Sequence, residues 1–77
     1  MKIDWKKYPW ANWAAVDKKG AIFLFRDKPM CVEESGFWWH SIMHPESVID
    51  EMEIGEDLEA AKDWKNSLTK RRRRKNA

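Results

Sequence analysis

Six consecutive cations near the carboxyl end of the sequence are the residues best suited to binding phosphate. They form the run KRRRRK, residues 70–75, after a stretch in which acids and bases are mixed. Cations at this density hold nucleic-acid backbones through contacts that weaken with salt and do not read the base sequence. A solvated, frayed helix end has the same composition, so both interpretations stay open. The predicted nucleic-acid-binding residues are Lys70, Arg71, Arg72, Arg73, Arg74 and Lys75.

An acidic stretch before this run is the second candidate for binding. Residues 46–63 contain eight carboxylates and one basic residue, Lys62. Residues 1–69 carry nine lysines and arginines against thirteen acids, a net charge of −4. A row of carboxylates can occupy the groove in which a partner protein holds nucleic acid, but carboxylates are also ordinary on the outer face of an amphipathic helix. We predict that Glu56, Asp57 and Glu59 contact a protein partner.

Aromatic side chains are the third candidate, because the sequence contains six tryptophans. Trp5, Trp10 and Trp13 cluster near its amino end. Large aromatic rings anchor protein interfaces and stack on nucleic-acid bases. A chain this short also needs such rings in its core, since it has little other apolar volume to bury. We predict that Trp5 and Trp10 contact the partner, and the choice between core and interface stays open for the tryptophans.

Histidine, cysteine and serine side chains give little indication of a metal centre or of catalysis. His40 and His44 stand four residues apart, and Cys31 would be a third ligand. However, Pro45 disfavours helical geometry at His44, and a structural zinc site uses four ligands at recognisable spacing. Neighbouring serines and histidines do not define a catalytic triad, and the sequence has no glycine-rich phosphate loop. We therefore expect no metal, no cofactor and no enzymatic activity.

The size of the chain limits how these groups can be held in place. Seventy-seven residues make one small domain. Because Cys31 is the only cysteine, an internal disulfide is excluded, and stability must come from aromatic packing or from a partner subunit, so a homodimer stays open. The first residues lack the apolar stretch of a signal peptide, and no segment approaches the roughly 20 apolar residues of a membrane span. We expect a soluble cytoplasmic protein that does not bind membranes.

Short apolar runs in the first half predict an antiparallel sheet. WAAV and AIFLF, residues 13–16 and 21–25, have the pattern of two strands joined by a turn in which Gly20 takes a positive φ. RDKP predicts a second turn before a strand MCV, and EESG predicts a third turn before a strand FWWHSI. Together these elements predict a three- to four-stranded meander, preceded by an aromatic arm over residues 1–12.

The second half predicts helices. Pro45 suits the first position of a helix and Gly55 its exit, which predicts a short helix over residues 45–55. Apolar residues at steps of three and four predict a second helix over residues 56–71. The predicted fold class is α+β, with a single domain over residues 1–69 and a basic tail over residues 70–77. The residues expected to pack between helix and sheet are Phe23, Phe25, Trp38, Trp64 and Leu68.

Several segments together resemble a broad group of small proteins of tailed bacteriophages. The segments are IDW, WANWAAVDKKGAIFLFRDKP, GFWW and DWKNSL, the last followed by lysines and arginines. Proteins of that group combine a tryptophan-containing arm, a D-x-x-G hairpin and a terminal W-x-x-S-L segment. The resemblance covers most of the chain and implies a phage origin. It supplies no catalytic residues, and the KRRRRKNA ending departs from it.

The resemblance implies a class of function that fits the absence of catalytic motifs. Small phage proteins often bind a host enzyme or a defence system and block it. Our first hypothesis is therefore a non-enzymatic, phage-encoded inhibitor that occludes a host or anti-phage defence protein in the bacterial cytoplasm, as an anti-CRISPR protein does. The alternative is a small nucleic-acid-binding accessory protein that uses the basic run. A third hypothesis is a sponge for a nucleotide signal.

Overall fold

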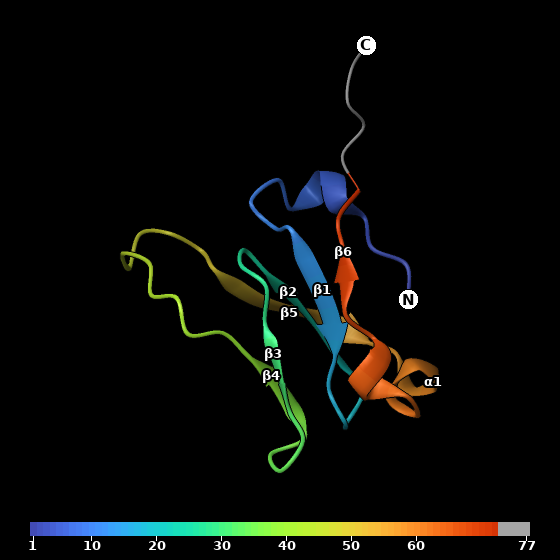
Figure 1. Ribbon diagram of the computed structural model, residues 1–77. Coiled ribbons are helices and arrows are strands. Elements are labelled where there is room, and N and C mark those ends of the chain that lie inside the picture. Colours follow the sequence, from blue (N-terminus) through green and yellow to red (C-terminus); the bar gives the residue numbers. More distant parts are fainter. Residues whose placement is uncertain (73–77) are drawn as a thin grey trace.

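A hairpin of two apolar strands forms the centre of the fold (Figure 1). In the computed structural model, which describes residues 1–72, strand β1 (Trp13–Val16) pairs antiparallel with β2 (Ala21–Phe25). Gly20 takes a φ of 97° in the turn, a value that favours glycine. One carboxylate oxygen of Asp17 accepts hydrogen bonds from the backbone of Lys19 and Ala21, which fixes the turn. The predicted hairpin is confirmed.

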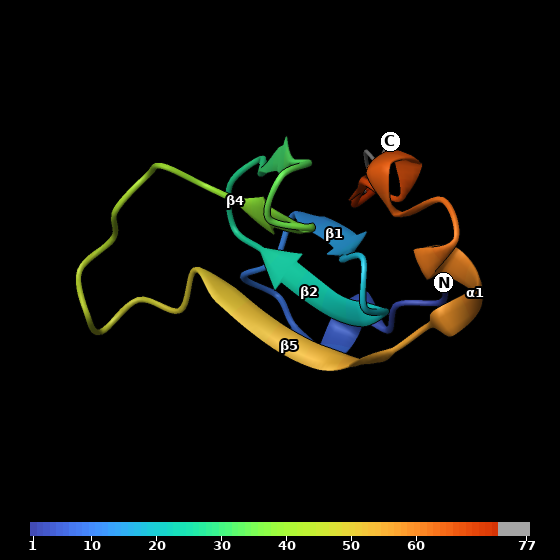
Figure 2. The ribbon, with the colours of Figure 1, turned by 90° about the horizontal axis from the view of Figure 1, so that it is seen from below.

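The next two strands form a small sheet of their own. β3 (Met30–Val32) pairs with β4 (Phe37–Trp39) around a turn in which Gly36 has a φ of 75°. Both strands were expected, but the single meander is only partly present, because β3 and β4 do not join the sheet that contains β1 and β2. The β3–β4 hairpin instead lies across one face of that sheet (Figure 2).

The predicted helix over residues 45–55 is wrong. Residues 51–56 form β5 (Glu51–Glu56), which pairs antiparallel with the free edge of β2. Within β5 the exposed Glu51 and Glu53 alternate with the half-buried Met52 and Ile54, which is the two-residue period of a strand. Ile54 has no partner opposite it, because the register shifts between Ile22 and Phe23. Pairing with β2 satisfies backbone groups that an isolated short helix would leave to solvent.

The predicted helix over residues 56–71 is also wrong. Only α1 (Leu58–Ala61) and a 3-10 turn, η2 (Trp64–Asn66), are helical there, and the chain then extends as β6 (Thr69–Lys70) along β1. The larger sheet therefore has the order β5-β2-β1-β6, and the fold is mostly strand with little helix. No helix within residues 1–72 is long and apolar enough to cross a membrane.

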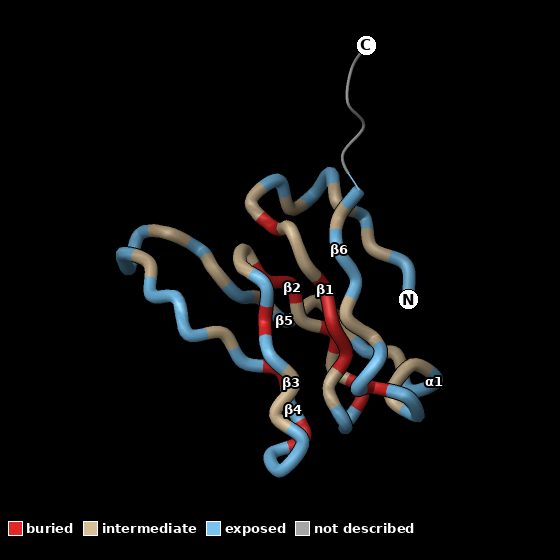
Figure 3. Tube along the Cα trace, viewed as in Figure 1, coloured by how far each residue is buried: buried red, intermediate tan, exposed pale blue. Residues whose placement is uncertain are grey.

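The larger sheet is covered on both faces, each by a thin aromatic cluster. Figure 3 shows that many buried positions lie along β1 and β2. On one face, the Trp38 and Trp64 rings meet edge to face, with centroids 6.4 Å apart. Phe23 and Leu68 pack against this cluster, so the predicted contacts between these residues are confirmed although no long helix supplies them. On the other face lies the arm, with η1 (Trp5–Lys7), against a second cluster built on Ala14 and Leu24.

The edge of β1 that faces the C-terminal segment needs a partner at Val16, which is fully buried. β6 pairs only with Trp13 and Ala14, so the side chain of Ser67 takes over at Val16. Ser67 Oγ accepts a hydrogen bond from the Val16 N–H at 2.9 Å and lies 3.1 Å from the Val16 carbonyl oxygen. The indole of Trp38 also donates to that carbonyl, at 3.0 Å. Ser67 therefore completes the hydrogen bonding of a buried strand.

Replacing Ser67 by alanine should lower the free energy of unfolding by about 1–3 kcal/mol, because it leaves the buried Val16 N–H without an acceptor. Urea unfolding followed by tryptophan fluorescence measures the change. The control Ser41→Ala removes an exposed hydroxyl with no hydrogen-bond partner among residues 1–72 and should stay within about 0.5 kcal/mol of the parent. Equal stability of the two variants would contradict this role for Ser67.

Candidate functional site

A basic groove opens where β1, β6 and the segment after β2 meet. Its volume is about 1050 Å³. Five of the residues that line it are cationic and one is acidic. The lining residues are Asn12, Trp13, Arg26, Asp27, Lys28, Leu68, Thr69, Lys70, Arg71 and Arg72.

Trp13 lies between two lysines of this groove. The antiparallel register of β1 and β6 places Lys70 directly opposite Trp13, and its ammonium nitrogen lies 5.7 Å from the centre of the indole ring. The ammonium of Lys28, which follows β2, lies 5.5 Å from the same ring. Within residues 1–72, neither lysine has a carboxylate at ion-pair distance. Both charges therefore face the groove with a π system as their neighbour.

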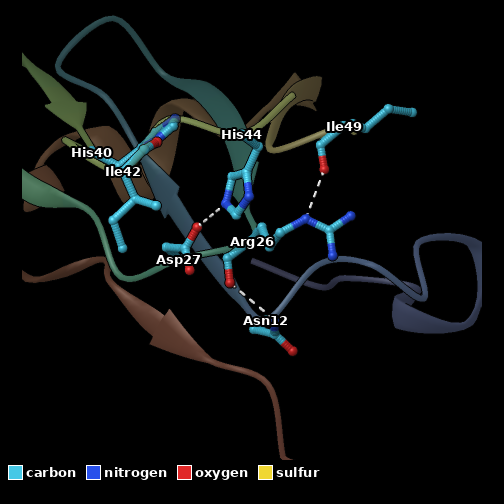
Figure 4. A network of polar contacts seen from close by, with 7 residues as sticks. All are labelled: Asn12, Arg26, Asp27, His40, Ile42, His44 and Ile49. Atoms are coloured by element: carbon cyan, nitrogen blue, oxygen red, sulfur yellow. Dashed lines mark hydrogen bonds and ion pairs between the residues drawn. The ribbon is translucent and has the colours of Figure 1, made fainter. Parts of the chain in front are cut away.

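Arg26 and Asp27 hold the long 40–50 segment against the end of β2 (Figure 4). Arg26 Nε donates to the Ile49 carbonyl at 3.0 Å, and its guanidinium carbon lies 5.9 Å from the centre of the Trp10 ring. Asp27, the acid that lines the groove, is hydrogen bonded to His44 Nε2. Figure 4 shows the His44 ring pointing at this carboxylate. Because five cations line the groove together with this one acid, the net charge of its lining is positive.

Arg71 connects the end of β6 to the N-terminal arm through hydrogen bonds. Its backbone N–H donates to the Asn12 carbonyl at 2.8 Å. Its Nη1 lies 3.1 Å from the Tyr8 carbonyl oxygen and 3.2 Å from that of Ala11, and it also reaches Pro9. One guanidinium therefore ties the aromatic arm to the end of β6.

Three of the six predicted nucleic-acid-binding residues, Lys70, Arg71 and Arg72, line the groove. Arg73, Arg74 and Lys75 lie outside the described residues. Lys28 and Arg26 were not among the residues predicted for this site. The two cations of RDKP, directly after the apolar run AIFLF, were the available signal, because the end of a strand is where side chains can meet those of its neighbours.

Of the acidic residues predicted to contact a protein partner, two are exposed and one forms contacts within the fold. Glu56 is exposed, and Glu59 is exposed beside Lys62 with an ion pair of 3.2 Å. Asp57 caps α1, where it accepts the Ala60 N–H at 3.0 Å, and it pairs with the terminal amino group at 3.3 Å. The Ala60 N–H, followed by that amino group, lowers the pKa of Asp57 below its ordinary value. Asp57 therefore stabilises the start of α1 and holds the terminal amino group.

Trp5 and Trp10, the other predicted contacts, pack half-buried against the second aromatic cluster. A guanidinium covers each ring, with Arg71 5.7 Å from the centre of Trp5 and Arg26 near Trp10. Both tryptophans thus contribute to the core and to the surface of the arm.

The histidines and the cysteine do not converge. Within residues 1–72, no three histidine, cysteine or acidic side chains lie in an arrangement that could hold a metal ion. His40 Nδ1 lies 3.2 Å from the Ile42 carbonyl oxygen, while His44 faces Asp27. Cys31 packs at the edge of the first aromatic cluster, and burial raises the pKa of its thiol. The candidate site is therefore the basic groove, which offers cations and the Trp13 ring for binding.

Comparisons of the chain with protein-family models, with curated proteins and with solved structures found no match. The function is accordingly argued from the groove and from the surfaces around it.

Replacing Arg71 by alanine should lower the free energy of unfolding by about 1–2 kcal/mol, because charge-assisted hydrogen bonds to the arm are lost. Arg71→Lys should restore less than half of this loss, since a single ammonium cannot reproduce the planar guanidinium. Urea unfolding measures both effects. Arg72→Ala removes an exposed cation one residue away and is the matched control. If Arg71→Ala were as stable as Arg72→Ala, the tie between Arg71 and the arm would be refuted.

Proposed function

We propose that the protein binds single-stranded nucleic acid in the basic groove around Trp13. The observation that supports this most is the position of Trp13 between Lys28 and Lys70. Proteins that bind single strands without sequence preference combine cations that follow the phosphates with aromatic rings on which bases stack. At about 1050 Å³, the groove is at the upper end of the range for small-molecule sites, which suits a polymer better than one nucleotide.

Binding would proceed by an exchange of partners at the Trp13 ring. Phosphates draw the flexible ammonium groups of Lys28 and Lys70 away from the indole, and a base takes their place on its face. A duplex cannot do this, because its bases are already stacked and paired. Arg72, which is exposed and has no ion-pair partner among the described residues, offers a third phosphate contact. The expected ligand is single-stranded and is bound with little regard to sequence.

Removing both groove lysines in Lys28→Ala/Lys70→Ala should weaken binding of a fluorescent single-stranded oligonucleotide by tenfold or more at low salt. Three phosphate contacts predict a slope of log K against log salt of about −2, and the double variant should make it shallower by about 1.4. Fluorescence anisotropy across a salt series measures both quantities.

The control is Lys19→Ala/Lys62→Ala, which removes the same charge from exposed positions outside the groove. If this control lost as much affinity as the groove variant, binding would reflect net charge and not the groove. Competition by a mononucleotide as effective as by the oligonucleotide would instead favour the nucleotide-sponge hypothesis.

A second function is favoured by the acidic edge of the larger sheet. β5 has a strand partner on one side only, and it carries the exposed Glu51, Glu53 and Glu56. None of these carboxylates has a hydrogen bond or ion pair within residues 1–72. A free row of carboxylates suits a partner protein with a basic surface. We propose on this basis a phage-encoded inhibitor that occludes the basic site of a host or defence protein.

If β5 is that interface, Glu53→Lys/Glu56→Lys should abolish stoichiometric capture of a protein from nuclease-treated bacterial lysate. The matched variant Lys28→Ala/Lys70→Ala should retain capture, because the groove is not involved. Affinity purification followed by mass spectrometry measures both. Capture that disappears with nuclease alone, or that depends on the groove lysines, would contradict the inhibitor and leave the nucleic-acid proposal in place.

A further inference from the structure

A smaller cleft lies between β4 and the β2–β5 edge, apart from the basic groove. Its volume is about 220 Å³, which is room for one side chain. β2 provides its floor, and the β3–β4 hairpin provides one wall. The lining residues are Asp17, Phe23, Phe37, Trp38, Trp39 and Glu51.

The walls of this cleft are aromatic, and the inner ones are fixed. Trp38 is 7% exposed, and its indole N–H donates to the Val16 carbonyl, which sets the plane of the ring. Phe23 packs against the same cluster. The outer rings are open to solvent, since Trp39 is 50% and Phe37 43% exposed. An aromatic surface this exposed on a small domain is typical of a binding site.

Two carboxylates stand at opposite ends of the cleft. Asp17 lies beside Ala21 at the start of β2, and Glu51 is opposite Phe25 at its end. Glu51 has no hydrogen bond or ion pair within residues 1–72, whereas one Asp17 oxygen is engaged by turn N–H groups. No basic residue lines the cleft, although Lys18 and Lys19 line a neighbouring hollow. The cleft is therefore aromatic and negative.

Three other partly exposed tryptophans of the chain each have a basic side chain over the ring. Arg71 lies over Trp5, Arg26 over Trp10, and two lysines over Trp13. Among the described residues, no cation lies over Trp39 or Phe37. These two rings therefore lack the covering group that the chain supplies to its other surface tryptophans.

We infer that this cleft receives an arginine side chain of a partner protein. A guanidinium stacks on aromatic faces and forms paired hydrogen bonds with a carboxylate, and it loses less hydration than an ammonium does. Its methylene stem would lie along Phe23 and Trp38, and its head would reach Glu51. Charge complementarity at Glu51 favours this occupant over an apolar side chain.

The test uses the full chain labelled with ¹⁵N and blocked arginine, N-acetyl-arginine methylamide, as the probe. Titration should shift the Trp39 indole N–H signal with a dissociation constant of about 1–10 mM, as befits one anchor group. Glu51→Gln should weaken binding threefold or more. Glu56→Gln makes the same charge change on the same strand outside the cleft and should leave binding unchanged. Blocked citrulline, which is the neutral isostere, should not bind, and blocked lysine should bind more weakly.

Any of three results would overturn the inference: no shift at Trp39, equal binding of citrulline or lysine, or equal effects of Glu51→Gln and Glu56→Gln. Sedimentation of the chain alone identifies the source of the arginine. Self-association that Glu51→Gln removes would place a second copy in the cleft, and would overturn a different protein as partner. This titration does not use the basic groove or a captured target, so its outcome can be distinguished from the tests of both proposed functions, although Glu51 also belongs to the acidic edge of β5.

Discussion

Burial of β1 is the constraint on which the rest of the structure depends. Ala14, Ala15 and Val16 are fully buried, so the backbone groups along both edges of the strand need hydrogen-bond partners within the protein. The hairpin turn brings β2 to one edge at once. The other edge can be satisfied only by a distant segment, and residues 67–71 supply it through Ser67, β6 and the Arg71 N–H. The closure of this edge fixes the path of residues 67–71.

The same closure creates the groove. Because β6 must be in register with β1, Lys70 is placed opposite Trp13 and Arg71 beside Asn12. The first residues of the basic run are thereby part of the sheet, and Arg71 is tied to the arm carbonyls. Residues that a linear view assigns to a tail after residue 69 thus serve folding and line the candidate site. The same side chains thus stabilise the sheet and line the candidate groove.

Sequence reasoning succeeded where the determining contacts are local. The WAAV–AIFLF hairpin is specified by its own two short apolar runs and by Gly20 between them, so it was predictable. Residues 51–56 and 64–70 fit helical and extended patterns about equally, and the free edges of β2 and β1 decided between them. The candidate site could be predicted only in part, because its residues are likewise brought together by strand pairing between distant segments. The basic run was evident, but the register that brings it to Trp13 depends on a pairing across more than 50 residues, and the position of Lys28 depends on the turn after β2.

The basic groove and the acidic strand β5 both keep their charge, because few of their charged side chains form ion pairs. Lys28 and Lys70 rest on an aromatic ring, and neither is paired with a carboxylate. A ring stabilises a cation without cancelling its charge, so the field in the groove remains available to an anion. A carboxylate at the same place would have closed the site by forming an ion pair. On β5 the glutamates likewise have no cation at ion-pair distance in the described part of the chain, so the field there remains negative. Both polarities persist because, of the ion pairs within residues 1–72, three lie at the helical turns, and the one at the groove, His44–Asp27, involves none of its lysines. The two proposed functions rest on these two surfaces of opposite sign, one on the groove and one on β5.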